Sequence, residues 1–64
     1  MVTLYRDLTK LLHDAGCSFK REGKGSHEIW FSPITNRTFT VPANIDNAPL
    51  ANAILKQAGL PKAI

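Results

Sequence analysis

Hydrophobic and polar positions along the chain follow two different periods. Near the start, apolar residues recur every three to four positions, the spacing that places them on one face of a helix. This stripe predicts a helix over residues 3–15, with Thr3 as its N-cap and Gly16 as the residue that ends it. The stripe consists of Leu4, Leu8, Leu11, Leu12 and Ala15.

A second helical stripe lies near the end of the chain. It predicts a helix over residues 48–58, with Asn47 or Ala48 at its boundary and Pro49 in its first turn. Gly59 is expected to end this helix. Its apolar face is predicted to consist of Leu50, Ile54, Leu55 and Ala58.

Between the two helices the pattern alternates with a period of two, which is typical of half-buried strands. Three strands are predicted, over residues 17–22, 26–32 and 37–41. The segments that join them are short and rich in turn residues, so both connections are expected to be hairpins. The order helix, three strands, helix predicts an α+β fold, a two-layer sandwich in which two helices cover one face of a three-stranded antiparallel sheet.

The second strand carries the residues of greatest chemical interest. By parity His27 shares a face with Ile29 and Phe31, while Glu28 and Trp30 point the other way. A histidine on an apolar face is more often a core residue than a catalyst, but the end of a strand lies at the rim of a sheet. Both interpretations of His27 stay open at this point.

Trp30 also admits more than one interpretation. On a solvent face it could stack on a base of RNA. It could equally pack under a helix or at an interface with a protein partner. The partner interface is the favoured hypothesis, because an exposed tryptophan on a small domain often marks such a site.

Composition narrows the class of protein. The chain has 64 residues, which predicts a single domain over residues 1–64, and its formal net charge is +3. One cysteine, Cys17, excludes an internal disulfide and is expected to be a small buried hydrophobe. No apolar run approaches the roughly 18 residues that span a membrane, and the first residues lack the apolar core of a signal peptide. A cytoplasmic protein is therefore expected.

Positive charge gathers directly before His27. Lys20, Arg21 and Lys24 fall within five residues and are candidate contacts for RNA phosphates, and Gly25 and Ser26 would shape the approach of RNA to the histidine. Neighbouring strand residues point to opposite faces, so Ser26 and His27 should not hydrogen-bond directly and a serine hydrolase is disfavoured.

RNA carries its own nucleophile, the 2′-hydroxyl group, so its cleavage needs only proton transfer and stabilisation of negative charge. A histidine beside cationic side chains suits this reaction. The spacing of histidines and the cysteine predicts no metal site, and no cofactor is expected.

Several of these segments together resemble the HicA family of toxins from prokaryotic toxin–antitoxin pairs. The resemblance covers about residues 8–60. The matching segments are Lys10-Leu11-Leu12, Ala15-Gly16, Gly25-Ser26-His27 with Ile29, Thr40-Val41-Pro42, and Ile54-Leu55-Lys56-Gln57-Ala58-Gly59-Leu60.

This resemblance implies a fold like that of double-stranded-RNA-binding domains and a metal-independent ribonuclease that cleaves mRNA. It also implies that His27 is the catalytic residue and that the partner is a HicB-like antitoxin protein. Family members commonly carry basic residues after the Val-Pro pair, but here residues 43–48 contain one acid and no base. Contacts between this segment and RNA phosphates are therefore in doubt.

Two other functions stay open. The chain could be an RNA-binding module of the same fold in which His27 only contacts RNA. It could also be an interaction domain whose partner is solely a protein.

Overall fold

The computed structural model describes residues 4–64. Its elements are α1 (Leu4–Asp14), β1 (Ser18–Glu22), β2 (His27–Ser32), β3 (Arg37–Pro42) and α2 (Ala48–Gln57). The predicted order is confirmed, and no predicted boundary differs from the observed one by more than one residue. The predicted N-cap Thr3 lies outside the described residues.

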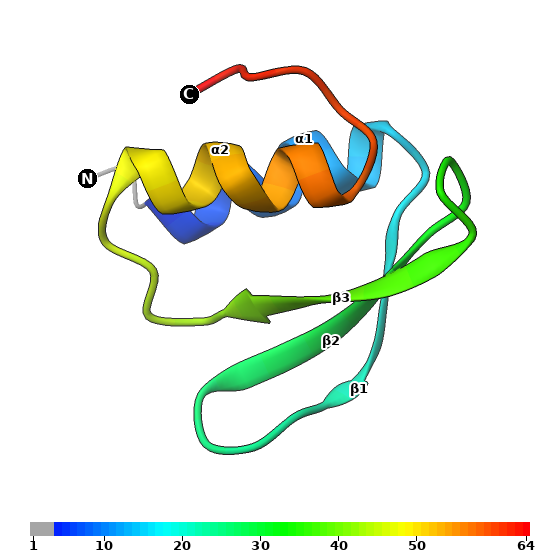
Figure 1. The fold of residues 1–64 in the computed structure, drawn as a ribbon. Coiled ribbons are helices and arrows are strands. Elements are labelled where there is room, and N and C mark those ends of the chain that lie inside the picture. Colours follow the sequence, from blue (N-terminus) through cyan, green and yellow to red (C-terminus); the bar gives the residue numbers. More distant parts are fainter. Residues whose placement is uncertain (1–3) are drawn as a thin grey trace.

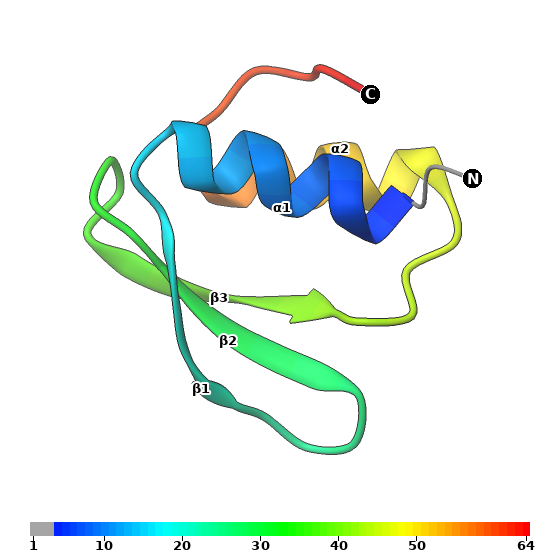
Figure 2. The ribbon, with the colours of Figure 1, turned by 180° about the vertical axis from the view of Figure 1, so that it is seen from behind.

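The three strands form one antiparallel sheet in the order β1-β2-β3. Both helices pack on the same side of this sheet, and the other side is left uncovered (Figures 1 and 2). The predicted two-layer α+β fold is therefore confirmed, and it is consistent with the double-stranded-RNA-binding-domain-like fold that the resemblance implied.

The hydrophobic core lies between the helices and the sheet. Leu8 and Leu12 of α1 are fully buried, which confirms the first predicted stripe. The remaining buried hydrophobic residues come from the sheet, from the loops and from α2, and they are Cys17, Trp30, Phe39, Val41, Ile45, Ala51, Ile54, Leu55 and Ala58. The burial of Cys17 agrees with its predicted role as a small hydrophobe.

The second predicted stripe is wrong at one position. Leu50 is 40% exposed, and Ala51 takes the place in the core that was expected for it. Ala51 stands three and four residues before Ile54 and Leu55, so the face of α2 toward the sheet starts one residue later than predicted.

The prediction of a half-buried first strand is also wrong. All five residues of β1 are exposed, and Phe19 is 46% exposed. β1 is an edge strand, and its pairing with β2 is interrupted by a bulge between Phe19 and Arg21. A bulge bends an edge strand and increases its twist, so this strand lies beyond the cover of the helices.

Side chains at the ends of α2 fix its position. Asn47 caps the helix, because its side-chain oxygen accepts a hydrogen bond of 2.8 Å from the backbone N–H of Leu50. At the other end Gly59 adopts a φ of 86°, as expected for the residue after a helix. The buried Ser32 hydroxyl donates a 2.7 Å hydrogen bond to the carbonyl of Ala58, which ties the end of β2 to the end of α2.

No helix among residues 4–64 has the length and apolar character needed to cross a membrane.

Candidate functional site

The turn between β1 and β2 holds the backbone of His27. The Gly23 N–H donates a 2.8 Å hydrogen bond to the His27 carbonyl, and the His27 N–H donates one of 3.2 Å to the Lys24 carbonyl. Gly25 has a φ of 65°, a conformation that glycine adopts without strain. The glycine-rich turn therefore places His27 at the first position of β2.

The side chain of His27 faces solvent. No side chain or backbone group of the described residues makes a hydrogen bond with its imidazole. The interpretation of His27 as a core residue is wrong, because the helices cover the other face of β2. Both ring nitrogens are thus available to a ligand.

The segment after β3 lies beside the same turn. His27 is paired with Pro42, and the Ala43 N–H donates a 2.8 Å hydrogen bond to the Ser26 carbonyl. The Ser26 hydroxyl donates to Oδ1 of Asn44 at 3.3 Å rather than to His27. The base-poor segment noted in the sequence therefore borders His27, and an asparagine amide stands there.

The uncovered side of the sheet forms a continuous surface around His27. Ser18 and Thr38 are paired with Phe31, Arg21 and Thr40 with Ile29, and Pro42 with His27, so each shares the face of its partner. Lys20 joins them because its Nζ lies 5.5 Å from the centre of the Phe31 ring. We call this surface the open face, and it consists of Ser18, Lys20, Arg21, His27, Ile29, Phe31, Thr38, Thr40 and Pro42.

The predicted RNA contacts fall into two groups. The structure brings Lys20 and Arg21 onto the open face with His27. Lys24, Gly25 and Ser26 form the adjoining turn, where all three are exposed. Lys24, Gly25 and Ser26 therefore adjoin His27 at one end of β2, whereas Arg21 pairs with Ile29 and Lys20 reaches the Phe31 ring farther along the open face.

Trp30 does not lie on the surface, where the partner-interface hypothesis requires it to be. Its side chain is 3% exposed and lies in the core, so the expectation of a surface tryptophan is wrong. Trp30 and Phe31 do point to opposite faces, as parity predicted, but the helices cover the tryptophan side. The His13 ring packs edge-on against Trp30, with 5.2 Å between ring centres.

A hydrogen-bonded carboxylate in the same region, that of Glu28, was not identified from the sequence. The Tyr5 hydroxyl contacts both carboxylate oxygens of Glu28, at 2.8 and 2.9 Å, and the Trp30 indole N–H donates to Oε1 at 3.0 Å. Burial, the hydrogen bond to Glu28 and its negative charge raise the pKa of Tyr5 above its ordinary value. This cluster joins α1 to β2 one residue after His27, on the opposite side of the strand.

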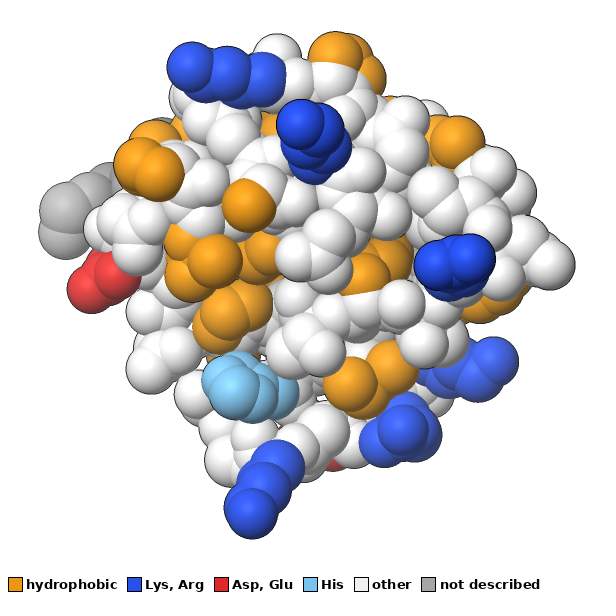
Figure 3. Space-filling view, viewed as in Figure 1, with side chains coloured by type: hydrophobic (Ala, Val, Ile, Leu, Met, Phe, Trp, Pro, Cys, Tyr) orange, Lys and Arg blue, Asp and Glu red, His pale blue; other side chains and the backbone are white. Residues whose placement is uncertain are grey.

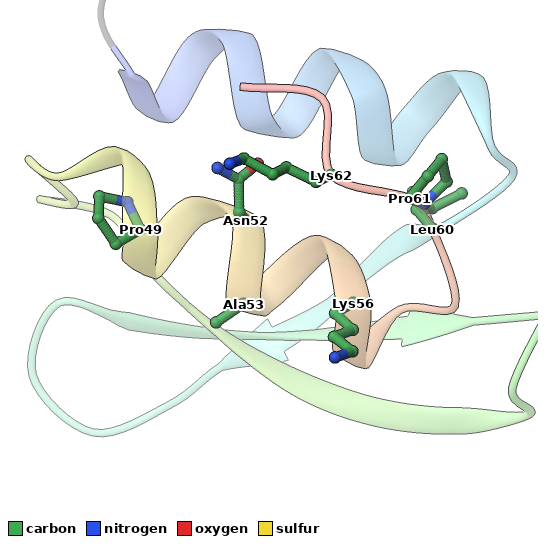
Figure 4. Close-up of a pocket in the computed structure, with 7 residues that line it drawn as sticks. All are labelled: Pro49, Asn52, Ala53, Lys56, Leu60, Pro61 and Lys62. Carbon is green, nitrogen blue, oxygen red and sulfur yellow. The ribbon is translucent and has the colours of Figure 1, made fainter.

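A shallow cavity of about 440 Å³ lies elsewhere, between α2 and the C-terminal segment (Figure 4). Its lining residues are Pro49, Asn52, Ala53, Lys56, Leu60, Pro61 and Lys62. The Asn52 amide holds the segment in place by donating to the Ile64 carbonyl at 2.8 Å and accepting from its N–H at 3.0 Å. No residue of the open face or of the β1–β2 turn lines this cavity.

Positive charge is not confined to the turn. Figure 3 shows lysine and arginine side chains spread over one side of the molecule, with few acidic side chains in view. The open face itself contains Lys20 and Arg21 and no acidic residue. Among residues 4–64, no three side chains of His, Cys, Asp or Glu form a group that could hold a metal ion.

Comparison with known proteins gives one match. A family model described as HicA toxin of bacterial toxin-antitoxin matches residues 5–60. No curated protein and no solved structure shows significant similarity to the chain. The matched residues include both helices from Tyr5 onward, the whole sheet and the turn that carries His27. The chain therefore belongs to the HicA family of toxins from bacterial toxin–antitoxin systems.

Proposed function

We propose that this toxin is a metal-independent endoribonuclease that cleaves mRNA, and that His27 is its acid–base catalyst. The observation that carries the proposal is the setting of His27. Its imidazole is exposed at the head of a strand, follows a closed backbone turn that carries Lys24, and shares the open face of the sheet with Lys20 and Arg21. Membership of a toxin family supports an activity that harms the cell.

The chemistry follows from the groups at this site. The neutral imidazole accepts the proton of the ribose 2′-hydroxyl, whose oxygen attacks the adjacent phosphorus. The bond between phosphorus and the 5′-oxygen breaks, and that oxygen receives a proton. The products are a 2′,3′-cyclic phosphate and a free 5′-hydroxyl, and Lys24, in the turn next to His27, is the candidate for stabilising the negative charge that builds up on phosphorus.

The test compares RNA cleavage by the parent protein, by His27→Ala and by His13→Ala. His13 is the matched control, because it is also an exposed histidine but lies on α1. We expect His27→Ala to lose cleavage and growth inhibition while remaining folded, and His13→Ala to keep both activities.

The same assay tests the independence from metal. Cleavage should continue in excess chelator, and a 2′-deoxy sugar at the cut site should prevent it because the attacking hydroxyl is missing. If chelator stops the reaction and Mg²⁺ or Mn²⁺ restores it, the mechanism is wrong. If His27→Ala binds and cuts RNA as the parent does, His27 is not the catalyst. Binding without any cleavage by the parent would favour an RNA-binding module instead.

A toxin of this family has an antitoxin partner. We propose that the partner is a HicB-like protein and that it neutralises the toxin by covering the exposed end of β2. Because Trp30 is buried, the partner cannot use that residue directly without a rearrangement of the core. Cleavage should fall in proportion to the amount of antitoxin bound, and binding that left cleavage unchanged would contradict this arrangement.

A further inference from the structure

The open face extends well beyond the histidine. Along β2 it continues from His27 past Ile29 to Phe31, a length of roughly 13 Å at the usual rise of a strand. Ile29 and Phe31 are half-buried although neither helix covers them. The proposed cleavage at His27 makes no use of Ile29 or Phe31.

The chemistry of this surface suits a particular ligand. Phe31 offers an aromatic ring, and the Lys20 ammonium group lies 5.5 Å from its centre. Arg21 stands across from Ile29, and the exposed Thr38 and Thr40 hydroxyls lie on the neighbouring strand. Single-stranded nucleic acids are bound by this combination of an aromatic platform for bases and cations for phosphates.

A duplex would not use these groups. Its bases are stacked on one another and are not free to stack on Phe31. A surface without acidic side chains also favours a polyanion over a protein of mixed charge. These two arguments select a single strand as the occupant.

We propose that the open face binds single-stranded RNA next to the site of cleavage, with a base stacked on Phe31 and phosphates held by Lys20 and Arg21. This inference rests on the proposed function, since it specifies the form of RNA that reaches His27. It transfers to Phe31 the base-stacking role considered for Trp30, because Phe31, although half-buried, lies on the open face, whereas Trp30 lies in the core.

The experiment measures binding to labelled single-stranded RNA and to a blunt duplex of the same sequence by fluorescence anisotropy. All variants are made in His27→Ala protein, so that the RNA stays intact. Phe31→Leu keeps an apolar side chain of similar size but has no aromatic ring, and it should weaken single-strand binding by roughly 5- to 100-fold. Phe31→Trp should retain binding.

Phe19→Leu is the matched control. Phe19 is a phenylalanine of the neighbouring strand and is 46% accessible, but it is paired with Trp30 and so faces the side of the sheet that carries the helices. This variant should bind RNA like its parent. Thermal unfolding of each variant confirms that it is folded at the temperature of the assay.

Three results would overturn the inference. The first is that Phe31→Leu binds single-stranded RNA as tightly as its parent does. The second is that the duplex binds as tightly as the single strand. The third is that Phe31→Leu binds the antitoxin more weakly than its parent does but binds RNA equally well. The last result would make the open face a protein interface. Failure of the proposed function is distinguishable, because it would appear as absent cleavage by the parent while Phe31-dependent binding persisted.

Discussion

Ser32 shows how much a single side chain contributes to joining distant parts of this small protein. It is the one polar residue that is buried among residues 4–64, and its hydroxyl makes two kinds of contact. It donates to the Ala58 carbonyl at 2.7 Å and accepts from the Ile34 N–H at 3.2 Å. One hydroxyl thus provides a hydrogen-bond partner for a backbone carbonyl at the end of α2 and for a backbone N–H in the β2–β3 turn.

We expect Ser32→Ala to lower the free energy of unfolding by about 1 to 3 kcal/mol, because it leaves buried backbone groups without a hydrogen bond. Urea denaturation measures the loss, with the exposed Ser18→Ala as control. The variant should still cleave RNA at temperatures where it is folded. A stability equal to that of the parent would mean that water replaces the hydroxyl.

Single residues also show the limits of inference from sequence. The position of His27 at the start of a strand was predictable, because the glycine-rich turn before it is a local signal. The burial of Trp30 was not predictable, because the alternation of residues assigns side chains to two faces of a strand without indicating which face the helices will cover. That choice depends on the packing of α1 and α2, in which Trp30 fills more of the core than Phe31 could.

At the scale of elements, the Tyr5–Glu28–Trp30 cluster provides hydrogen bonds between α1 and β2. Partners 23 residues apart in sequence cannot be found from local spacing, and Glu28 alone resembles any surface acid. Strand order, hairpins and helix ends were predictable because turn residues and caps act locally. The exposure of β1 was not, since alternation in the sequence does not reveal a bulge at an edge strand.

The cluster gives a prediction about pH. The raised pKa of Tyr5 means that the folded state holds the phenol proton more tightly than the unfolded state does. Its contribution to stability is therefore complete below pH about 10, the ordinary tyrosine value, and is lost as pH rises through the folded pKa.

We expect the parent to exceed Tyr5→Phe in free energy of unfolding by about 1 kcal/mol at neutral pH. This difference should shrink above pH about 10. Denaturant titrations of both proteins at several pH values measure it, and the subtraction cancels the effects of other groups. A difference that stayed constant up to the highest pH would show that the hydroxyl contributes nothing through its proton.

At the scale of the whole molecule, the positions of the cationic side chains should matter more for RNA binding than the net charge of the protein. The chain carries eight lysines and arginines against five acids, and the basic groups are spread over its surface. Lys20 and Arg21 lie on the open face with His27, and Lys24 lies in the turn that precedes it. Cations far from the open face and this turn should add little to RNA binding.

Replacing Lys20, Arg21 and Lys24 by Ala should flatten the plot of log affinity against log salt concentration by up to about 2 units, since each phosphate contact contributes about 0.7 for a single strand. The control removes three other exposed cations, Lys10, Lys56 and Lys62, and so has the same net charge. Equal slopes for the two triple variants would show that RNA responds only to total charge.

The burial of Trp30 has a practical consequence for all of these measurements. It is the only tryptophan in the chain, and its indole lies in the core, on the other side of the sheet from the open face. Its fluorescence emission should be that of an apolar environment and should move to longer wavelength when the protein unfolds. A ligand on the open face should leave the emission maximum nearly unchanged. The protein thus carries an optical reporter of its fold, and a variant that loses cleavage but keeps native emission has lost chemistry rather than structure.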